Sequence, residues 1–120
     1  MKRILVVDDR AELRDFMQVA LARAGYDVVL ARNGAEALAV QRERSAELVI
    51  TDIFMPEVDG IELIDRLRAA YPGTRVIAIS AGVPGLQDYL KVARQIGCDA
   101  TLAKPFGAEA LLRVVGSVLG

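Results

Sequence analysis

Five side chains that can take part in chemistry stand at the ends of short apolar runs. They are Asp8, Asp9, Asp52, Ser80 and Lys104. A carboxylate can attack phosphorus or bind a metal ion, and a hydroxyl or an ammonium group can donate hydrogen bonds to a phosphoryl group. A single aspartate after an apolar run is usually a turn residue or a helix cap. Four such places in one sequence instead indicate a common site.

The apolar runs that precede these residues are short and rich in β-branched side chains, as is typical of strands buried on both faces of a sheet. Between the runs lie segments with helical spacing, which end near glycine or proline. The predicted strands are RILVV at 3–7, DVVLA at 27–31, ELVIT at 47–51, RVIAIS at 75–80 and ATLA at 100–103. The predicted helices lie near 13–21, 35–41, 63–71, 86–96 and 108–119.

Strict alternation of strand and helix with short connections predicts a parallel sheet covered on both faces. The fold class is α/β, with a doubly wound five-stranded sheet of order 2-1-3-4-5 and five helices in a flavodoxin-like three-layer sandwich. We expect one domain over residues 1–120, because this length fits a single core and contains no linker or repeat. In this strand order, ligands bind at the carboxyl ends of strands 1 and 3.

Asp8, Asp9 and Asp52 should therefore meet in one pocket. Two unit charges about 4 Å apart repel each other by roughly 4 kcal/mol at an effective dielectric of about 20, so the cluster favours a bound cation. Mg²⁺ fits best, because it binds one or two carboxylates, several waters and a phosphate oxygen. Lys104 and Ser80 would then add an ammonium and a hydroxyl donor around a phosphoryl group on Asp52.

Composition excludes several classes of function. The net charge of -1 offers no basic stripe for nucleic acid, and no apolar run approaches the ~18 residues of a membrane helix. The chain has no histidine, which removes the commonest general base and zinc ligand. Cys98 is the only cysteine, so no internal disulfide can form. These features predict a cytoplasmic protein that contacts neither nucleic acid nor membrane directly.

The motifs, taken in order, resemble those of receiver domains of two-component response regulators, the family typified by the bacterial chemotaxis receiver. The matching pieces extend over the whole chain: ILVVDD at 4–9, Arg14, DIFMPEVDG at 52–60, Ser80-Ala81, Gly97 and AKPF at 103–106. Each piece alone is a weak signal, but together they form a specific pattern.

The resemblance implies a signalling switch that catalyses only its own phosphorylation and dephosphorylation. Asp52 would accept a phosphoryl group from a histidine kinase or a histidine phosphotransfer protein. The Mg²⁺ ligands would be Asp9 directly, Asp8 through water, Asp52, and the backbone carbonyl of Phe54.

The resemblance also assigns roles to the donors. Lys104, followed by a cis bond to Pro105, would pair with the phosphoryl group, and Ser80 would move to bond it. Helix 4, strand 5 and helix 5 would form the face that binds a downstream protein target or a second copy. The family usually has Tyr or Phe three residues before the lysine, where this chain has Thr101.

Three other functions are weighed against this one. An aspartyl-phosphate phosphatase would need acids two residues apart after the first strand, whereas Asp8 and Asp9 are adjacent. A carrier of FMN would need a phosphate loop rich in Ser, Thr and Gly in place of DDRAEL. A receiver-like interaction module that works without phosphorylation would not need the full set of acids, hydroxyl and lysine.

Overall fold

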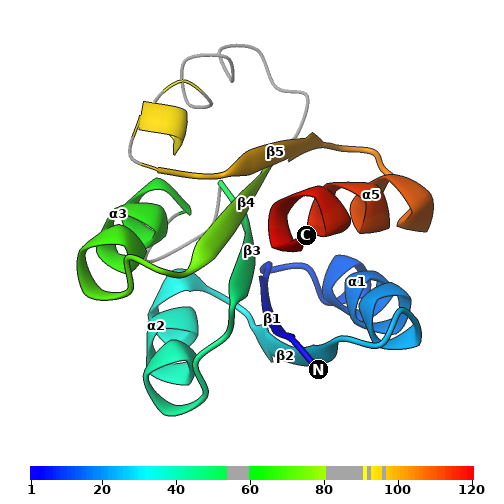
Figure 1. Ribbon diagram of the computed structural model, residues 1–120, viewed down its shortest axis with the longest axis horizontal. Coiled ribbons are helices and arrows are strands. Elements are labelled where there is room, and N and C mark those ends of the chain that lie inside the picture. The colour runs from blue at the N-terminus through cyan, green and yellow to red at the C-terminus, as the bar shows by residue number, and fades with distance from the viewer. Residues whose placement is uncertain (54–59, 81–90, 92, 96) are drawn as a thin grey trace.

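The computed structural model describes residues 1–53, 60–80, 91, 93–95 and 97–120. Five parallel strands form one sheet in the order β2-β1-β3-β4-β5 (Figure 1). The strands are β1 (Arg3–Val7), β2 (Asp27–Ala31), β3 (Leu48–Asp52), β4 (Arg75–Ser80) and β5 (Ala100–Ala103). The predicted fold class and strand order are confirmed, and only β3 differs from its predicted bounds, by one residue at each end.

Four helices follow strands as predicted: α1 (Ala11–Arg23), α2 (Gly34–Glu43), α3 (Gly60–Ala70) and α5 (Ala108–Leu119). The α5 bounds match the prediction. Between β4 and β5, residues 91 and 93–95 are helical, and the rest of the predicted fourth helix lies outside the described residues. Of the helices that the structure describes, none is both long and apolar enough to cross a membrane.

The helices cover the two faces of the sheet in pairs, with α1 and α5 on one face and α2 and α3 on the other (Figure 1). Successive strand residues point to opposite faces. The strand side chains on the first face include Ile4, Val6, Leu48, Ile50 and Ile77, which pack with Met17 and Leu21 of α1 and Leu111 and Val115 of α5. Those on the second include Leu5, Val7, Val49 and Val76, which pack with Leu63, Ile64 and Leu67 of α3. Both faces of the central strands are therefore buried.

The apolar side chains of α5 take part in this packing. Leu111 and Val115 are fully buried, whereas Leu112, Val114, Val118 and Leu119 are partly buried against the same core cluster. Among the described residues, the large apolar side chains with the greatest exposure are Met1, Phe16 and Val19, and the last two belong to α1.

Candidate functional site

Three carboxylates meet at the carboxyl edge of the sheet. Asp8 directly follows β1 and Asp52 is the last residue of β3, and these strands pair with Val7 beside Thr51. One side-chain oxygen from each of Asp8, Asp9 and Asp52 lies within 4.8 Å of the other two. Asp8 is fully buried, Asp52 is 5% exposed and Asp9 is exposed. The cluster thus has a buried floor and an open side.

Lys104 supplies the positive charge inside this cluster. Its Nζ donates a 2.7 Å hydrogen bond to Oδ2 of Asp52 and lies 3.8 Å from Oδ2 of Asp8. The backbone nitrogen of Lys104 donates to the Ser80 carbonyl at 2.8 Å, which extends the pairing of β4 with β5 by one residue. The Lys104–Pro105 bond is cis, as the resemblance implied.

Ser80 ends β4 next to the strand that carries Asp52. Asp52 pairs with Ile79, and Ser80 follows at the edge with only 4% of its surface exposed. The structure therefore brings Asp8, Asp9, Asp52, Ser80 and Lys104 to one edge. Phe54, the proposed carbonyl ligand, lies outside the described residues.

Burial dominates the electrostatics of Asp8. Loss of water raises the pKa of the Asp8 carboxyl above its ordinary value, and the Asp52 and Asp9 charges raise it further. Two groups act in the opposite direction and lower that pKa: the backbone N–H of Arg10, which donates to Oδ1 at 2.8 Å, and the Lys104 ammonium. The environment of the Asp8 carboxyl therefore disfavours its ionised form.

A divalent cation fits this group of donors. Oδ2 of Asp8 is buried and accepts no hydrogen bond from the described residues, because the Lys104 ammonium, at 3.8 Å, is too distant for one. A buried oxygen in this state is unfavourable unless another donor or a cation reaches it. Hard oxygen ligands at an open acidic edge match the preference of Mg²⁺, which keeps several waters, better than that of Ca²⁺, which takes six to eight oxygens.

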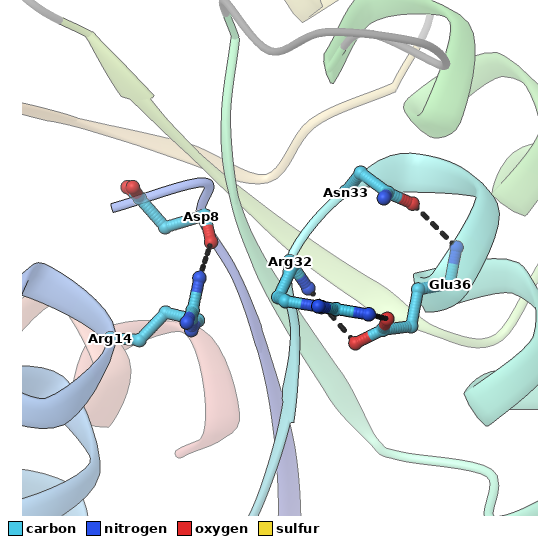
Figure 2. Close-up of polar contacts among 5 residues, drawn as sticks. All are labelled: Asp8, Arg14, Arg32, Asn33 and Glu36. Carbon is cyan, nitrogen blue, oxygen red and sulfur yellow. Dashed lines mark hydrogen bonds and ion pairs between the residues drawn. The ribbon is translucent and has the colours of Figure 1, made fainter. Parts of the chain in front are cut away.

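Two features beside the cluster go beyond the predicted site, although Arg14 itself is one of the pieces that match the receiver pattern. Arg14 of α1 donates from Nη1 to the backbone carbonyl of Asp8 at 2.7 Å (Figure 2). A groove beside the cluster is lined by residues from three places: Arg10 before α1, Glu12, Leu13 and Phe16 of α1, and Lys104, Pro105 and Phe106 after β5. In this groove the rings of Phe16 and Phe106 lie 6.2 Å apart. The available signal in the sequence was the aromatic side chain of Phe16, whose exposure only the structure shows.

Thr101, which replaces the usual aromatic residue, lies on β5. Its Oγ1 accepts a hydrogen bond from Nη2 of Arg94 at 3.4 Å. Thr101 pairs with Ala78, two residues before Ser80 on β4. The position is thus occupied by a small polar side chain that contacts the segment between β4 and β5.

Comparison with known proteins agrees with this arrangement. A family model described as response regulator receiver domain matches residues 4–116. The chain is 37% identical over 118 residues to the chemotaxis protein CheY of Bacillus subtilis, and this alignment covers 98% of the chain and 97% of CheY. It is 34% identical over 118 residues to the phosphate regulon transcriptional regulatory protein PhoB of Pseudomonas aeruginosa. That match covers 98% of this chain but 52% of PhoB, so the chain spans about half of this longer relative.

Solved structures give the same result. The chemotaxis protein CheY4 of Vibrio cholerae superposes with a TM-score of 0.89 at 29% identity, covering 98% of both chains. NtrX of Brucella abortus superposes with a TM-score of 0.92 at 31% identity, covering 98% of this chain and 26% of NtrX.

Proposed function

Because the chain belongs to the family of response regulator receiver domains, we propose that it is a phosphoacceptor switch in which Asp52 receives a phosphoryl group. The donor would be a histidine kinase or a histidine phosphotransfer protein. The observation that carries the proposal is the 2.7 Å contact of Lys104 with Asp52, inside a cluster of three carboxylates. A carboxylate in such a setting is both a nucleophile and part of a cation site.

In the transfer step, an oxygen of the Asp52 carboxylate forms a bond to phosphorus while the P–N bond of the donor phosphohistidine breaks. The imidazole leaves with the bonding electron pair and takes up a proton from solvent. Negative charge spreads over the three phosphoryl oxygens, so the protein acts mainly by positioning and charge stabilisation. Mg²⁺ held by Asp8, Asp9, Asp52 and the carbonyl of Phe54 would supply positive charge to those oxygens.

The chain's own donors have distinct tasks in this proposal. Lys104 holds Oδ2 of Asp52 before the reaction and can follow the phosphoryl oxygens afterwards. Ser80, one strand away, supplies a hydroxyl for a further phosphoryl oxygen. Phosphorylation adds about -1.5 to -2 charges near neutral pH, and Lys104 and Ser80 are placed to respond to that charge. Hydrolysis of the acyl phosphate would return the switch to its starting state.

The output of the switch would be a changed surface formed by the segment before β5, β5 itself and α5. Its partner would be a downstream protein or a second copy of the chain. We further propose that residues 1–120 act as a single receiver domain in the cytoplasm. In this reading the chain is not an enzyme that turns over an outside substrate.

Asp52→Asn tests the assignment of the acceptor. The amide keeps the shape but is not a nucleophile, so incubation with acetyl phosphate and Mg²⁺ should add one phosphoryl group to the parent and none to the variant. Intact-mass spectrometry reads the result. Asp65→Asn, an exposed change on α3, is the matched control and should label like the parent. Labelled Asp52→Asn would contradict the proposal, and an unlabelled parent would favour a module that works without phosphorylation.

A further inference from the structure

The Asp8–Asp9 peptide is held by a side chain that belongs to no part of the proposed phosphoryl chemistry. Arg14 donates from Nη1 to the Asp8 carbonyl at 2.7 Å, and the Asp8 carboxylate points away from the guanidinium (Figure 2). Arg14 therefore contacts the backbone of the acidic pair and is not the counterion of its carboxylate. The contact fixes the oxygen of the peptide bond that joins Asp8 to Asp9.

The end of β2 explains why this carbonyl needs a partner. The Asp8 nitrogen donates to the Ala31 carbonyl at 3.1 Å, so β1 still pairs with β2 at this point. In a parallel ladder, the Asp8 carbonyl would next accept from the nitrogen of residue 33. Asn33 instead caps α2, and its side chain accepts from the Glu36 nitrogen at 2.8 Å (Figure 2). The hydrogen bonding between β1 and β2 therefore ends here. Asp8 is fully buried, so its carbonyl needs a hydrogen-bond donor from outside the sheet.

Arg14 satisfies it from the beginning of α1. The side chain is half-buried, and its guanidinium is planar with several fixed donors, which suits a single well-oriented bond to a carbonyl. Together with the Arg10 nitrogen on Oδ1 of Asp8, this bond ties the end of β1 to the start of α1. Of the groups of Asp8 that can form hydrogen bonds, only Oδ2 has no such partner among the described residues. That oxygen belongs to the carboxylate cluster.

We propose that Arg14 is a positioning residue for the divalent-cation site: by holding the Asp8 carbonyl, it orients the Asp8–Asp9 peptide so that both carboxylates face Asp52. This inference rests on the proposed function, because it assigns Arg14 a task at the same Mg²⁺ site. It adds a residue of α1 that touches neither the cation nor the phosphoryl group.

The proposal can be separated from a simple charge effect, because the two predict opposite changes in Mg²⁺ affinity when Arg14 is replaced. Removing a positive charge near a cation site strengthens cation binding by Coulomb's law. Removing a group that orients the ligands weakens it, typically ~10–100-fold for partners of metal ligands. Arg14→Met removes both the charge and the donor, so the direction of the change identifies the dominant role.

The experiment is calorimetric titration of Mg²⁺ into the whole chain, after each variant is shown to be folded by circular dichroism. We expect Arg14→Met to weaken Mg²⁺ binding about tenfold or more. Arg14→Lys keeps the charge and a donor, so its Mg²⁺ affinity should lie between those of Arg14→Met and the parent. Arg23→Met, an exposed change at the other end of α1, should bind like the parent. Phosphorylation by acetyl phosphate should need more Mg²⁺ in Arg14→Met yet approach the parent rate at saturating metal.

An Mg²⁺ affinity in Arg14→Met equal to or above that of the parent would overturn the proposal, as would Arg14→Lys binding no better than Arg14→Met. If Arg14→Met does not fold, Arg14→Gln gives the same comparison with a smaller change. The failure of the proposed function looks different, because a parent that binds no Mg²⁺ and accepts no phosphoryl group would remove the site itself. A parent that does both, beside an unaffected Arg14 variant, would overturn the Arg14 proposal alone.

Discussion

At the scale of single residues, the buried Asp8 carboxylate makes the metal-free protein sensitive to pH. Burial raises the pKa of Asp8, so the folded state keeps this proton to a higher pH than the unfolded state, which releases it near pH 4. As pH rises through this interval, the unfolded state loses its proton first and the free energy of unfolding falls. Asp8→Asn removes the titrating charge, and we expect it to be more stable than the parent at pH 7 without metal. Urea unfolding in a chelator at pH 4 and pH 7 measures the difference, which should grow with pH.

Asp27 provides a control of opposite sign. A hydrogen bond from Arg3, 2.7 Å long, lowers the pKa of Asp27, so its contribution to stability is present above the unfolded pKa and is lost as pH falls. Asp27→Asn should therefore be less stable than the parent at pH 7 and approach it in acid. If Asp8→Asn were also less stable than the parent at pH 7, the pKa-lowering effects of Lys104 and the Arg10 nitrogen on Asp8 would outweigh burial. The explanation given for Asp8 would then be wrong.

At the scale of elements, the start of α3 packs directly on the backbone of the acceptor. Gly60 donates to the Ile53 carbonyl at 2.9 Å, and a Cβ at this position would clash with the Asp52 carbonyl oxygen. We expect Gly60→Ala to displace this backbone, destabilise the fold by about 1–3 kcal/mol and slow phosphorylation. Chemical denaturation and acetyl phosphate labelling are the measurements. Gly116→Ala in α5 is the control: apart from the adjacent backbone of α5 itself, an added Cβ would meet no atom within 4 Å, and we expect a gain of about 0.5–1 kcal/mol.

A second prediction at this scale concerns β5. Thr101 is too small to act as an aromatic gate, and its contact with Arg94 is a single 3.4 Å hydrogen bond. We expect phosphorylation to act through Ser80 and the segment that follows it. Hydrogen exchange with and without beryllofluoride should show its largest change across residues 80–97 and a smaller one in β5. Ser80→Ala should suppress this change in hydrogen exchange, whereas Thr101→Ala should preserve it. A change centred on β5 that disappears in Thr101→Ala would contradict this prediction.

At the scale of the whole molecule, the carboxylate cluster couples metal binding to folding. Asp8 and Asp52 are buried beside each other, and a cation that binds only the folded state stabilises it, by ~2.7 kcal/mol at a hundred times its Kd. We expect Mg²⁺ to raise the melting temperature, by roughly 4 °C for each kcal/mol in a domain of this size. Melting curves with Mg²⁺ or NaCl at equal ionic strength give the result. Asp9→Ala should lose the response, and equal melting temperatures of the parent in both salts would refute the site.

The sequence by itself determined the strands, the sheet order and the edge at which the five reactive side chains lie. The strands depend on local patterns, since short apolar runs alternate with helical segments, whereas the sheet order and the shared carboxyl edge follow from the doubly wound fold class that this alternation indicates. The one-residue difference in β3 has a tertiary cause. Asp52 pairs with Ile79 and the Ile53 nitrogen donates to the Ile79 carbonyl, so the neighbouring strand β4 sets where β3 ends.

Only the tertiary structure decided how the site is held. The raised pKa of Asp8 follows from burial among residues distant in sequence, and the 2.7 Å contact of Lys104 with Asp52 joins residues 52 positions apart. The bond from Arg14 to the Asp8 carbonyl has the same origin, because that carbonyl lacks a strand partner only after β2 ends and α2 begins. A sequence pattern records which residues are apolar or charged, but the need of one buried carbonyl for a donor arises only when the strands are paired.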